Sequence, residues 1–154
     1  MYHYTDCGLN NVWLKNGYNV VDTPYGRGVS IDDADALHEL LALDLTKKAG
    51  RLTGKEFRFL RTMLCLSQQS FGNMQGLSEQ AVSIWERTGK VPVPADAMMR
   101  MLVLEKLEGD GKMSVIIERI NTVERLVNQQ IVASEHRHKW RSKTQAEKPE
   151  LATA

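Results

Sequence analysis

The stretch of residues 66–87 constrains the fold of this chain more than any other part of its sequence. Ser67 and Ser78 each precede a short run of helix-forming residues, and a serine in that position caps a helix with its hydroxyl oxygen. Gly76 lies between the two runs and permits a tight turn. A capping box, Thr53-Gly54-Lys55-Glu56, begins another helix just upstream. The sequence therefore predicts three successive short helices, with a glycine turn between the last two.

The apolar residues of this stretch recur so that they meet inside the angle between the second and third helices. Gly72 supplies the small residue that lets these two helices approach closely. The side chains that we expect to be buried there are Phe71, Met74, Val82 and Trp85. The outer side of the third helix keeps short or amide-bearing groups and one isoleucine: Glu79, Gln80, Ser83 and Ile84. This pattern predicts a buried inner face and a solvent-facing outer face.

The same segment carries a set of motifs in a fixed order. They are the Leu66-Ser67-Gln68 opening, Gly76, Ser78, the pair Trp85-Glu86 followed by Gly89, and Pro92. On these motifs the chain resembles the XRE, or lambda-repressor-like, helix-turn-helix family over about residues 53–107. Phe71-Gly72 stands where the family more often has Leu-Ala. That difference concerns packing and leaves the outer face of the third helix unchanged.

The resemblance implies that the third helix enters the major groove of DNA. It assigns base reading to Ser78, Glu79, Gln80, Ser83 and Ile84, and phosphate contact to Gln68, Arg87, Thr88 and Lys90. A glutamine amide can make two hydrogen bonds to adenine, so most weight falls on Gln80. Glu79 either accepts a hydrogen bond from cytosine or repels phosphate and lowers non-specific binding. Such proteins usually bind as dimers, with half-sites about 34 Å apart.

The chain as a whole is also similar to bacterial regulators grouped with the MqsA/YgiT antitoxins, whose C-terminal half is such a module. In that group the N-terminal half holds zinc on four cysteines. This chain has two cysteines, Cys7 and Cys65, so it can build neither that site nor a disulfide framework. We interpret Cys65 as core filling within the first of the three helices. We expect no metal site and no cofactor.

Residues 1–50 are predicted to form a hairpin followed by a helix. Asn16-Gly17 lies between two β-prone runs, which is a strong hairpin signal. The two runs are residues 12–14 and 18–21. Asp32 or Asp33 can cap the helix, which we expect to end at about Thr46. Its apolar face is predicted to consist of Leu37, Leu40, Leu41 and Leu45.

The C-terminal part is predicted to be an amphipathic helix at residues 112–133 and then a polar tail. The helix carries a heptad-like seam made of Ile116, Ile120, Val123 and Val127. The seam is either a dimer contact or core packing within one chain, because periodicity does not separate the two. Residues 134–154 are expected to be disordered. Within them, the basic run at 136–143 suits either an arm that wraps DNA or a solvated tail.

Charge and motif content narrow the classes of function. Residues 1–50 contain seven acidic and four basic residues, whereas residues 51–108, the predicted DNA-binding domain, contain six and eight. Residues 109–154 again contain six acidic and eight basic residues, so phosphate is repelled by residues 1–50 and mildly attracted by the rest. We find no signal peptide, no run long enough to span a bilayer and no nucleophile with a matching base. We expect neither a membrane protein nor an enzyme.

These observations predict a mainly α, cytoplasmic protein that binds double-stranded DNA sequence-specifically. We expect a transcriptional regulator, in the form of a repressor that binds a palindromic operator as a homodimer. The alternative is the antitoxin of a type II toxin–antitoxin pair. Such a protein would bind a toxin through residues 1–50, whose acidic bias suits a basic partner, and would regulate its own operon.

Overall fold

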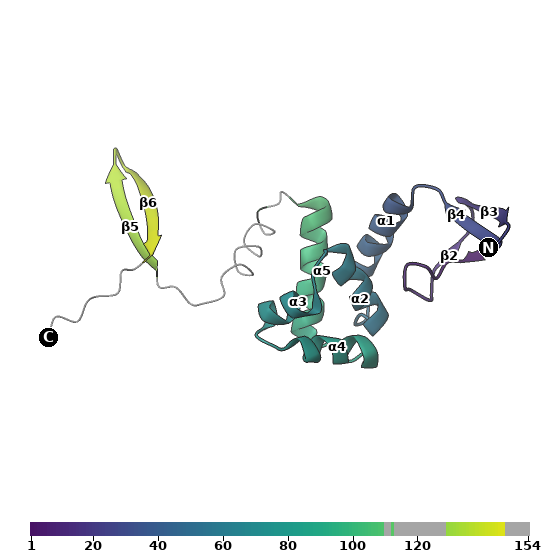
Figure 1. Ribbon diagram of the computed structural model, residues 1–154. Helices are drawn as coiled ribbons and strands as arrows, with labels where there is room; N and C mark the ends of the chain where they lie inside the picture. Colours follow the sequence, from purple (N-terminus) through teal and green to yellow (C-terminus); the bar gives the residue numbers. More distant parts are fainter. Residues whose placement is uncertain (110–111, 113–128, 147–154) are drawn as a thin grey trace. The chain divides into compact units, whose positions relative to one another are not determined.

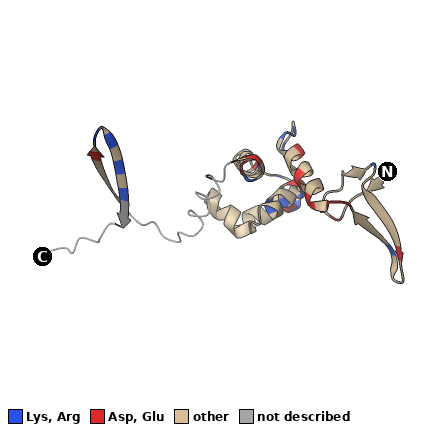
Figure 2. Cartoon of the chain, turned by 90° about the horizontal axis from the view of Figure 1, so that it is seen from above, with Lys and Arg blue, Asp and Glu red and all other residues tan. Residues whose placement is uncertain are grey.

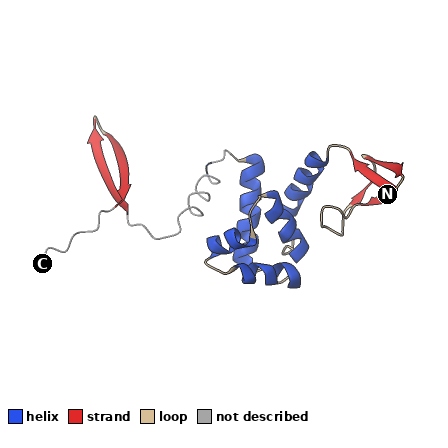
Figure 3. Cartoon of the chain, viewed as in Figure 1, coloured by secondary structure: helices blue, strands red, loops and turns tan. Residues whose placement is uncertain are grey.

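A computed structural model describes residues 1–109, 112 and 129–146 of the chain. The chain divides into two compact units, residues 1–121 and 122–154, which we describe separately. Among the described residues, the first unit has four strands followed by five helices, and the second has one hairpin (Figures 1 and 3). The described part is thus a mixed α/β structure, with more strand than the mainly α prediction allows.

The N-terminal strands form two separate antiparallel sheets of two strands each. β1 (Tyr2–His3) pairs with β2 (Trp13–Leu14), and β3 (Tyr18–Thr23) pairs with β4 (Gly26–Ile31). The prediction that Asn16-Gly17 joins two paired strands is therefore wrong. The hairpin turn lies at Pro24-Tyr25, because β3 finds a six-residue partner in β4 whereas β2 offers only two residues. Asn16-Gly17 connects one sheet to the other.

α1 (Ala34–Thr46) begins and ends as predicted, but one of the four leucines predicted for its apolar face points away from the core. Asp33 is its N-cap and accepts a hydrogen bond from the amide of Ala36 at 3.3 Å. Ala42 is fully buried, whereas Leu40, predicted to be on the apolar face, is 56% exposed. The two positions are separated by about 200° around a helix, so both cannot face inward. The other three predicted leucines do pack on the core: Leu37, Leu41 and Leu45.

Four further helices follow with short connections. They are α2 (Gly54–Met63), α3 (Gln68–Gln75), α4 (Glu79–Thr88) and α5 (Val93–Glu108). The three predicted caps are confirmed, because Thr53, Ser67 and Ser78 each accept a hydrogen bond from the amide three residues later, at 3.2, 3.0 and 3.2 Å. Gly76 ends α3 in the left-handed region with a φ of 68°, so the glycine turn before α4 is confirmed as well.

The prediction that Cys65 fills the core is wrong. α2 ends at Met63, and Cys65 lies exposed in the connection to α3 with a φ of 55°. This left-handed conformation terminates the helix. The periodic pattern of the preceding residues therefore does not extend to Cys65, and its side chain faces solvent.

Aromatic rings form the centre of the helical core. Phe57 of α2 packs edge-on against Phe71 of α3 and Trp85 of α4, with ring centroids 5.1 and 6.0 Å apart. Phe71, Val82 and Trp85 are buried and Met74 is partly buried. The predicted apolar contact between α3 and α4 is therefore confirmed.

Two glycines let backbone segments of different helices touch. A β-carbon on Gly72 would lie 2.9 Å from the carbonyl oxygen of Leu77, which is closer than ordinary contact. A β-carbon on Gly54 would overlap the carbonyl oxygen of Glu86. The role predicted for Gly72 is confirmed, and Gly54 brings the start of α2 against the end of α4 in the same way.

A polar cluster ties α5 to the connection between α1 and α2. Asp96 accepts a hydrogen bond from the amide of Leu52 at 2.7 Å and forms an ion pair with Arg100 at 2.8 Å. Arg100 also donates to the carbonyl oxygens of Lys48, at 2.6 Å, and Gly50. Because α1 also packs on α5, the helix of the N-terminal segment belongs to the same compact unit as the later helices.

The C-terminal predictions have separate outcomes. The seam of Ile116, Ile120, Val123 and Val127 lies outside the described residues. Residues 129–133 are strand rather than the end of the predicted helix at 112–133, and residues 134–146 of the supposedly disordered tail complete a hairpin. Its strands are β5 (Gln129–His136) and β6 (Lys139–Ala146). The composition of the tail is polar, but the basic residues of β6 (Lys139, Arg141 and Lys143) occupy every second position, which is the period of a strand.

Candidate nucleic-acid interface

A cleft of about 680 Å³ lies beside α4 and is lined by residues from the first turns of α2 and α3 and from both ends of α4. Four residues predicted to contact DNA line it: Gln68, Glu79, Ser83 and Arg87. The remaining lining residues are Gly54, Lys55, Arg58, Arg61, Ser67 and Glu86. The start of a helix carries partial positive charge and unsatisfied amide donors. The starts of α2 and α3 at this cleft therefore favour an anion, although the end of α4 also borders it.

Positive side chains outnumber negative ones at the rim of this cleft. Lys55, Arg58 and Arg87 are exposed, and none of them forms an ion pair within the part of the chain that the structure describes. Glu79 is the exposed carboxylate of the lining. Three exposed positive charges against one negative charge add to the effect of the helix starts.

A buried ion pair holds the helices around the cleft. Arg61 of α2 donates from Nε and Nη2 to the two carboxylate oxygens of Glu86 of α4, at 3.1 and 2.9 Å. These side chains are 13% and 5% exposed. Arg61 also donates to the carbonyl oxygen of Leu66 at 2.9 Å, and Gln68 donates from Nε2 to Glu86 at 3.2 Å. Because a two-pronged arginine–carboxylate pair fixes geometry, this network sets how α2, α3 and α4 meet.

The side chain of Gln68 thus already donates one of its hydrogen bonds within the protein. It is the first residue of α3, is half-buried and lines the cleft. One amide N–H is used by Glu86, and a glutamine side chain has a second N–H and a carbonyl oxygen. Gln68 can therefore still donate one hydrogen bond to an anion in the cleft.

The outer face of α4 is exposed, as the sequence predicts. Glu79 and Gln80 in the first turn are exposed, Ser83 is half-buried and Ile84 is 46% exposed. The spacings of three and four residues place these side chains on one side of the helix. Ser78, the N-cap, uses its hydroxyl oxygen to accept a first-turn amide, so its O–H is what it can offer to a partner.

Thr88 and Lys90, which were predicted to touch phosphate, take part in ending α4. The hydroxyl of Thr88 donates to the carbonyl oxygen of Ile84 at 2.7 Å and accepts from the amide of Lys90 at 3.3 Å. Both residues are exposed, but neither lines the cleft. Among the four residues predicted for phosphate, the structure brings Gln68 and Arg87 to the cleft and leaves these two outside it.

Two cleft residues, Lys55 and Arg58, were missed by the sequence analysis. Both are exposed on α2, and they lie three residues apart. Phe57 and Leu60 are fully buried, and each lies about 200° around the helix from one of the two cations. A helical projection of residues 54–63 contains this signal, because it places the two cations opposite the buried face of α2.

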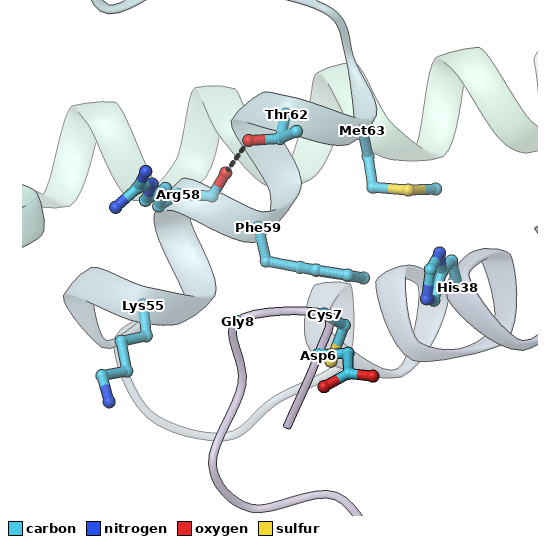
Figure 4. A pocket seen from close by; sticks show the side chains of 9 residues that line it. All are labelled: Asp6, Cys7, Gly8, His38, Lys55, Arg58, Phe59, Thr62 and Met63. Atoms are coloured by element: carbon cyan, nitrogen blue, oxygen red, sulfur yellow. Dashed lines mark hydrogen bonds between the residues drawn. The ribbon is translucent and has the colours of Figure 1, made fainter. Parts of the chain in front are cut away.

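A second hollow, of about 530 Å³, lies between α1, α2 and the N-terminal loop, which is the connection between β1 and β2 at residues 4–12 (Figure 4). Phe59 of α2 extends between His38 of α1 and Cys7 of the N-terminal loop in this view. Lys55 and Arg58 border this hollow as well as the cleft beside α4. The two spaces are therefore neighbours that share two positive side chains.

Buried contacts between Tyr4 and His38 anchor the N-terminal loop at this hollow. The hydroxyl of Tyr4 is 2.8 Å from Nε2 of His38, which also packs edge-on against Phe59 with centroids 6.0 Å apart. Tyr4 is 4% exposed, and burial raises the pKa of its phenol above the ordinary value of 10.0. These groups hold the N-terminal loop on α1 and α2.

Among the described residues, no group of three or more His, Cys, Asp or Glu side chains could hold a metal ion. None of the described helices is both long and apolar enough to cross a membrane. Comparisons with protein-family models, with curated proteins and with solved structures find no match to this chain. The geometry and charge of the cleft suit a polyanion that lies against the exposed face of α4.

Proposed function

We propose that this chain binds double-stranded DNA sequence-specifically and regulates transcription, with α3, the Gly76 turn and α4 acting as a lambda-repressor-like helix-turn-helix. One observation carries the proposal. The exposed polar face of α4 lies beside a cleft that is lined by the starts of α2 and α3 and by three exposed cations without ion pairs among the described residues. The major groove of B-DNA admits an α-helix, and phosphates border that groove on both sides.

In this proposal α4 reads the bases. The amide of Gln80 makes two hydrogen bonds to adenine, and the carboxylate of Glu79 accepts a hydrogen bond from cytosine. Ser83 bonds to either kind of base edge, and Ile84 contacts the methyl group of thymine. These four side chains share one side of α4, so together they read a few adjacent base pairs.

The cations around the cleft hold the DNA backbone in this proposal. Lys55, Arg58 and Arg87 pair with phosphates, and Gln68 contributes its remaining amide hydrogen. Phosphate contacts fix the orientation of a protein on the duplex without reading sequence. The buried pair of Arg61 and Glu86 serves this purpose indirectly, because it keeps α4 in register with the two phosphate-binding helices.

We further propose that the protein is a cytoplasmic repressor that binds a palindromic operator as a homodimer. A single α4 contacts too few base pairs to define an operator. Two copies related by a twofold axis would place their α4 helices in successive major grooves, about 34 Å apart. The repressor would act by covering a promoter.

The proposal is tested by selecting duplexes from a random library with the full-length chain and then measuring affinity. We expect selected DNA to bind about 10³-fold more tightly than random DNA. Gln80→Ala should weaken the selected duplex by about 1–3 kcal/mol and abolish the preference at one base pair. The matched variant Arg58→Ala should weaken selected and random duplexes alike. Equal affinity of the wild-type chain for selected and random DNA would contradict the proposal.

An acidic surface on α1 favours a second function, that of an antitoxin. Asp35, Glu39 and Asp44 are exposed on this helix, together with the apolar side chain of Leu40. Such a surface suits a basic protein, for example a toxin that is an RNase. Co-expression with a small basic protein from an adjacent reading frame tests this function. It requires a stable complex in size-exclusion chromatography, which the DNA-binding function alone does not.

A further inference from the structure

The hairpin of the second unit has a tight turn. Arg137 and His138 are the two turn residues, with φ of 50° and 63°, and His136 pairs with Lys139 across the strands. Two successive positive φ values are typical of a turn whose twist matches that of the strands beside it. The amide of His138 also donates to the carboxylate of Glu135 at 2.8 Å. The side chains of the two strands therefore have a defined register.

The register sorts the side chains of the hairpin into two different faces. One face carries the cross-strand pairs His136–Lys139, Ser134–Arg141 and Val132–Lys143. The other carries Glu135–Trp140 and Ala133–Ser142. Paired residues lie on the same side of a sheet and successive residues alternate. One face of the hairpin is therefore basic and contains no carboxylate.

The charge on this face is exposed. All residues from 130 to 143 are solvent-exposed, and Figure 2 shows the basic residues alternating along β6. The described hairpin has four Lys and Arg residues and one acid, Glu135, which gives a net charge of +3 from four minus one. Glu135 lies on the other face and its carboxylate accepts a hydrogen bond from the turn. It does not neutralise the basic face.

The spacing of the charges fits a nucleic-acid backbone. Lys139, Arg141 and Lys143 alternate along one strand, so neighbouring cations are separated by two residues, about 6.8 Å. That distance is twice the rise of about 3.4 Å between phosphates of one strand of B-DNA. A two-stranded ribbon also fits the major groove in width, as an α-helix does. A regular row of cations therefore matches a regular row of phosphates better than the scattered carboxylates of a protein.

We propose that the basic face of β5–β6 binds the phosphate backbone of double-stranded DNA as a second contact, separate from α4. The inference rests on the proposed function for its ligand, but it uses residues of the other unit. The hairpin reads no bases in this proposal. It adds affinity for any duplex, while the choice of sequence stays with α4.

A charge-matched pair of variants of the full-length chain tests this inference. The first is K139Q/R141Q/K143Q on the basic face. The second is K15Q/R27Q/K47Q, which removes three exposed cations from residues 1–50 and gives the same net charge. Affinity for the selected duplex and for a random duplex is measured by fluorescence anisotropy at several salt concentrations. Circular dichroism establishes that both variants remain folded.

We expect the hairpin variant to lose about tenfold in affinity for both duplexes and to lower the slope of log affinity against log salt by about three. The ratio of selected to random affinity should not change, in contrast to Gln80→Ala. The variant of residues 1–50 should match the wild type. An unchanged slope and affinity in the hairpin variant would overturn the inference and leave the proposed function intact.

Two further outcomes separate the inference from the proposed function. If the wild-type chain binds all duplexes equally and the hairpin variant loses that binding, the proposed function fails and the inference stands. If the hairpin variant loses affinity for single-stranded RNA but not for duplex DNA, or loses only self-association, the basic face has another partner and the inference is wrong.

Discussion

The cleft beside α4 and the β5–β6 hairpin are both positively charged, but they are built in opposite ways. At the cleft, the buried pair of Arg61 and Glu86 fixes the helices that carry the exposed groups. On the hairpin, all residues from 130 to 143 are exposed, and the strands are joined by their backbone ladder. When a buried ion pair fixes the helices, the exposed groups on them can be held to the accuracy that hydrogen bonds to bases need. Charges that are not fixed by buried contacts suit attraction to phosphate, which does not require that accuracy.

The largest effect should come from removing the buried ion pair that fixes the helices around the cleft. Glu86→Ala would leave Arg61 as an unpaired buried charge, and we expect a loss of about 3 kcal/mol in the free energy of unfolding. Urea unfolding followed by circular dichroism measures it. The matched change in the hairpin, Glu135→Ala, removes an exposed carboxylate and should cost less than about 0.5 kcal/mol. Similar costs for the two variants would contradict the difference drawn between the two surfaces.

A smaller effect should appear in the pH dependence of the stability of the first unit, which contains the cleft beside α4. Burial alone would raise the pKa of Glu56, but hydrogen bonds from Lys48, at 2.6 Å, and from the amide of Thr53, at 2.9 Å, outweigh it and hold the pKa below its ordinary value of 4.5. The unfolded chain therefore binds this proton more readily than the folded chain.

The contribution of Glu56 to stability is then complete above its ordinary pKa and is lost as the pH falls through the lower folded value. We expect Glu56→Gln to flatten the decline of stability below about pH 4.5. Lys48→Met should flatten it in part, because it removes one of the two hydrogen bonds. Urea unfolding at a series of pH values measures both. A decline in Glu56→Gln as steep as in the wild type would show that other groups cause it.

The smallest effect should come from relieving the turn of the hairpin. Arg137 and His138 adopt positive φ, which costs ordinary residues roughly 1 kcal/mol each. Arg137→Asn with His138→Gly provides the pair that this turn favours. Hydrogen exchange of the β5 amides should slow by up to about tenfold, while the thermal unfolding of residues 1–121 should stay the same. A shift in that unfolding would show that the hairpin and the first unit stabilise each other.

The parts of the fold that depend on neighbours in sequence could be predicted. Thr53, Ser67 and Ser78 were identified as caps because a cap acts on an amide only three residues away. The burial of Phe71 and Val82 followed from helical spacing. The exposed residues of α4 followed in turn, since they are what remains when the buried face is assigned.

The parts that depend on distant pairing could not be predicted in this way. Asn16-Gly17 is a sound hairpin signal, but it cannot reveal that β3 has a longer partner in β4. The network of Arg61, Gln68 and Glu86 joins three helices, and no local pattern marks it. The hairpin at residues 129–146 could not be predicted for another reason, because its polar composition is equally typical of disorder.

Gly54 and Gly72 are positions at which this fold does not tolerate a side chain, in contrast to the outer face of α4. At both positions the neighbouring backbone occupies the space of a β-carbon, so any side chain there would displace α4 from its place. The outer positions of α4, such as Gln80, meet no comparable restriction, since they point to solvent. Substitutions on the outer face of α4 can therefore accumulate one residue at a time on a constant scaffold, and under the proposed function descendants of this chain would acquire new target sequences without passing through an unfolded intermediate.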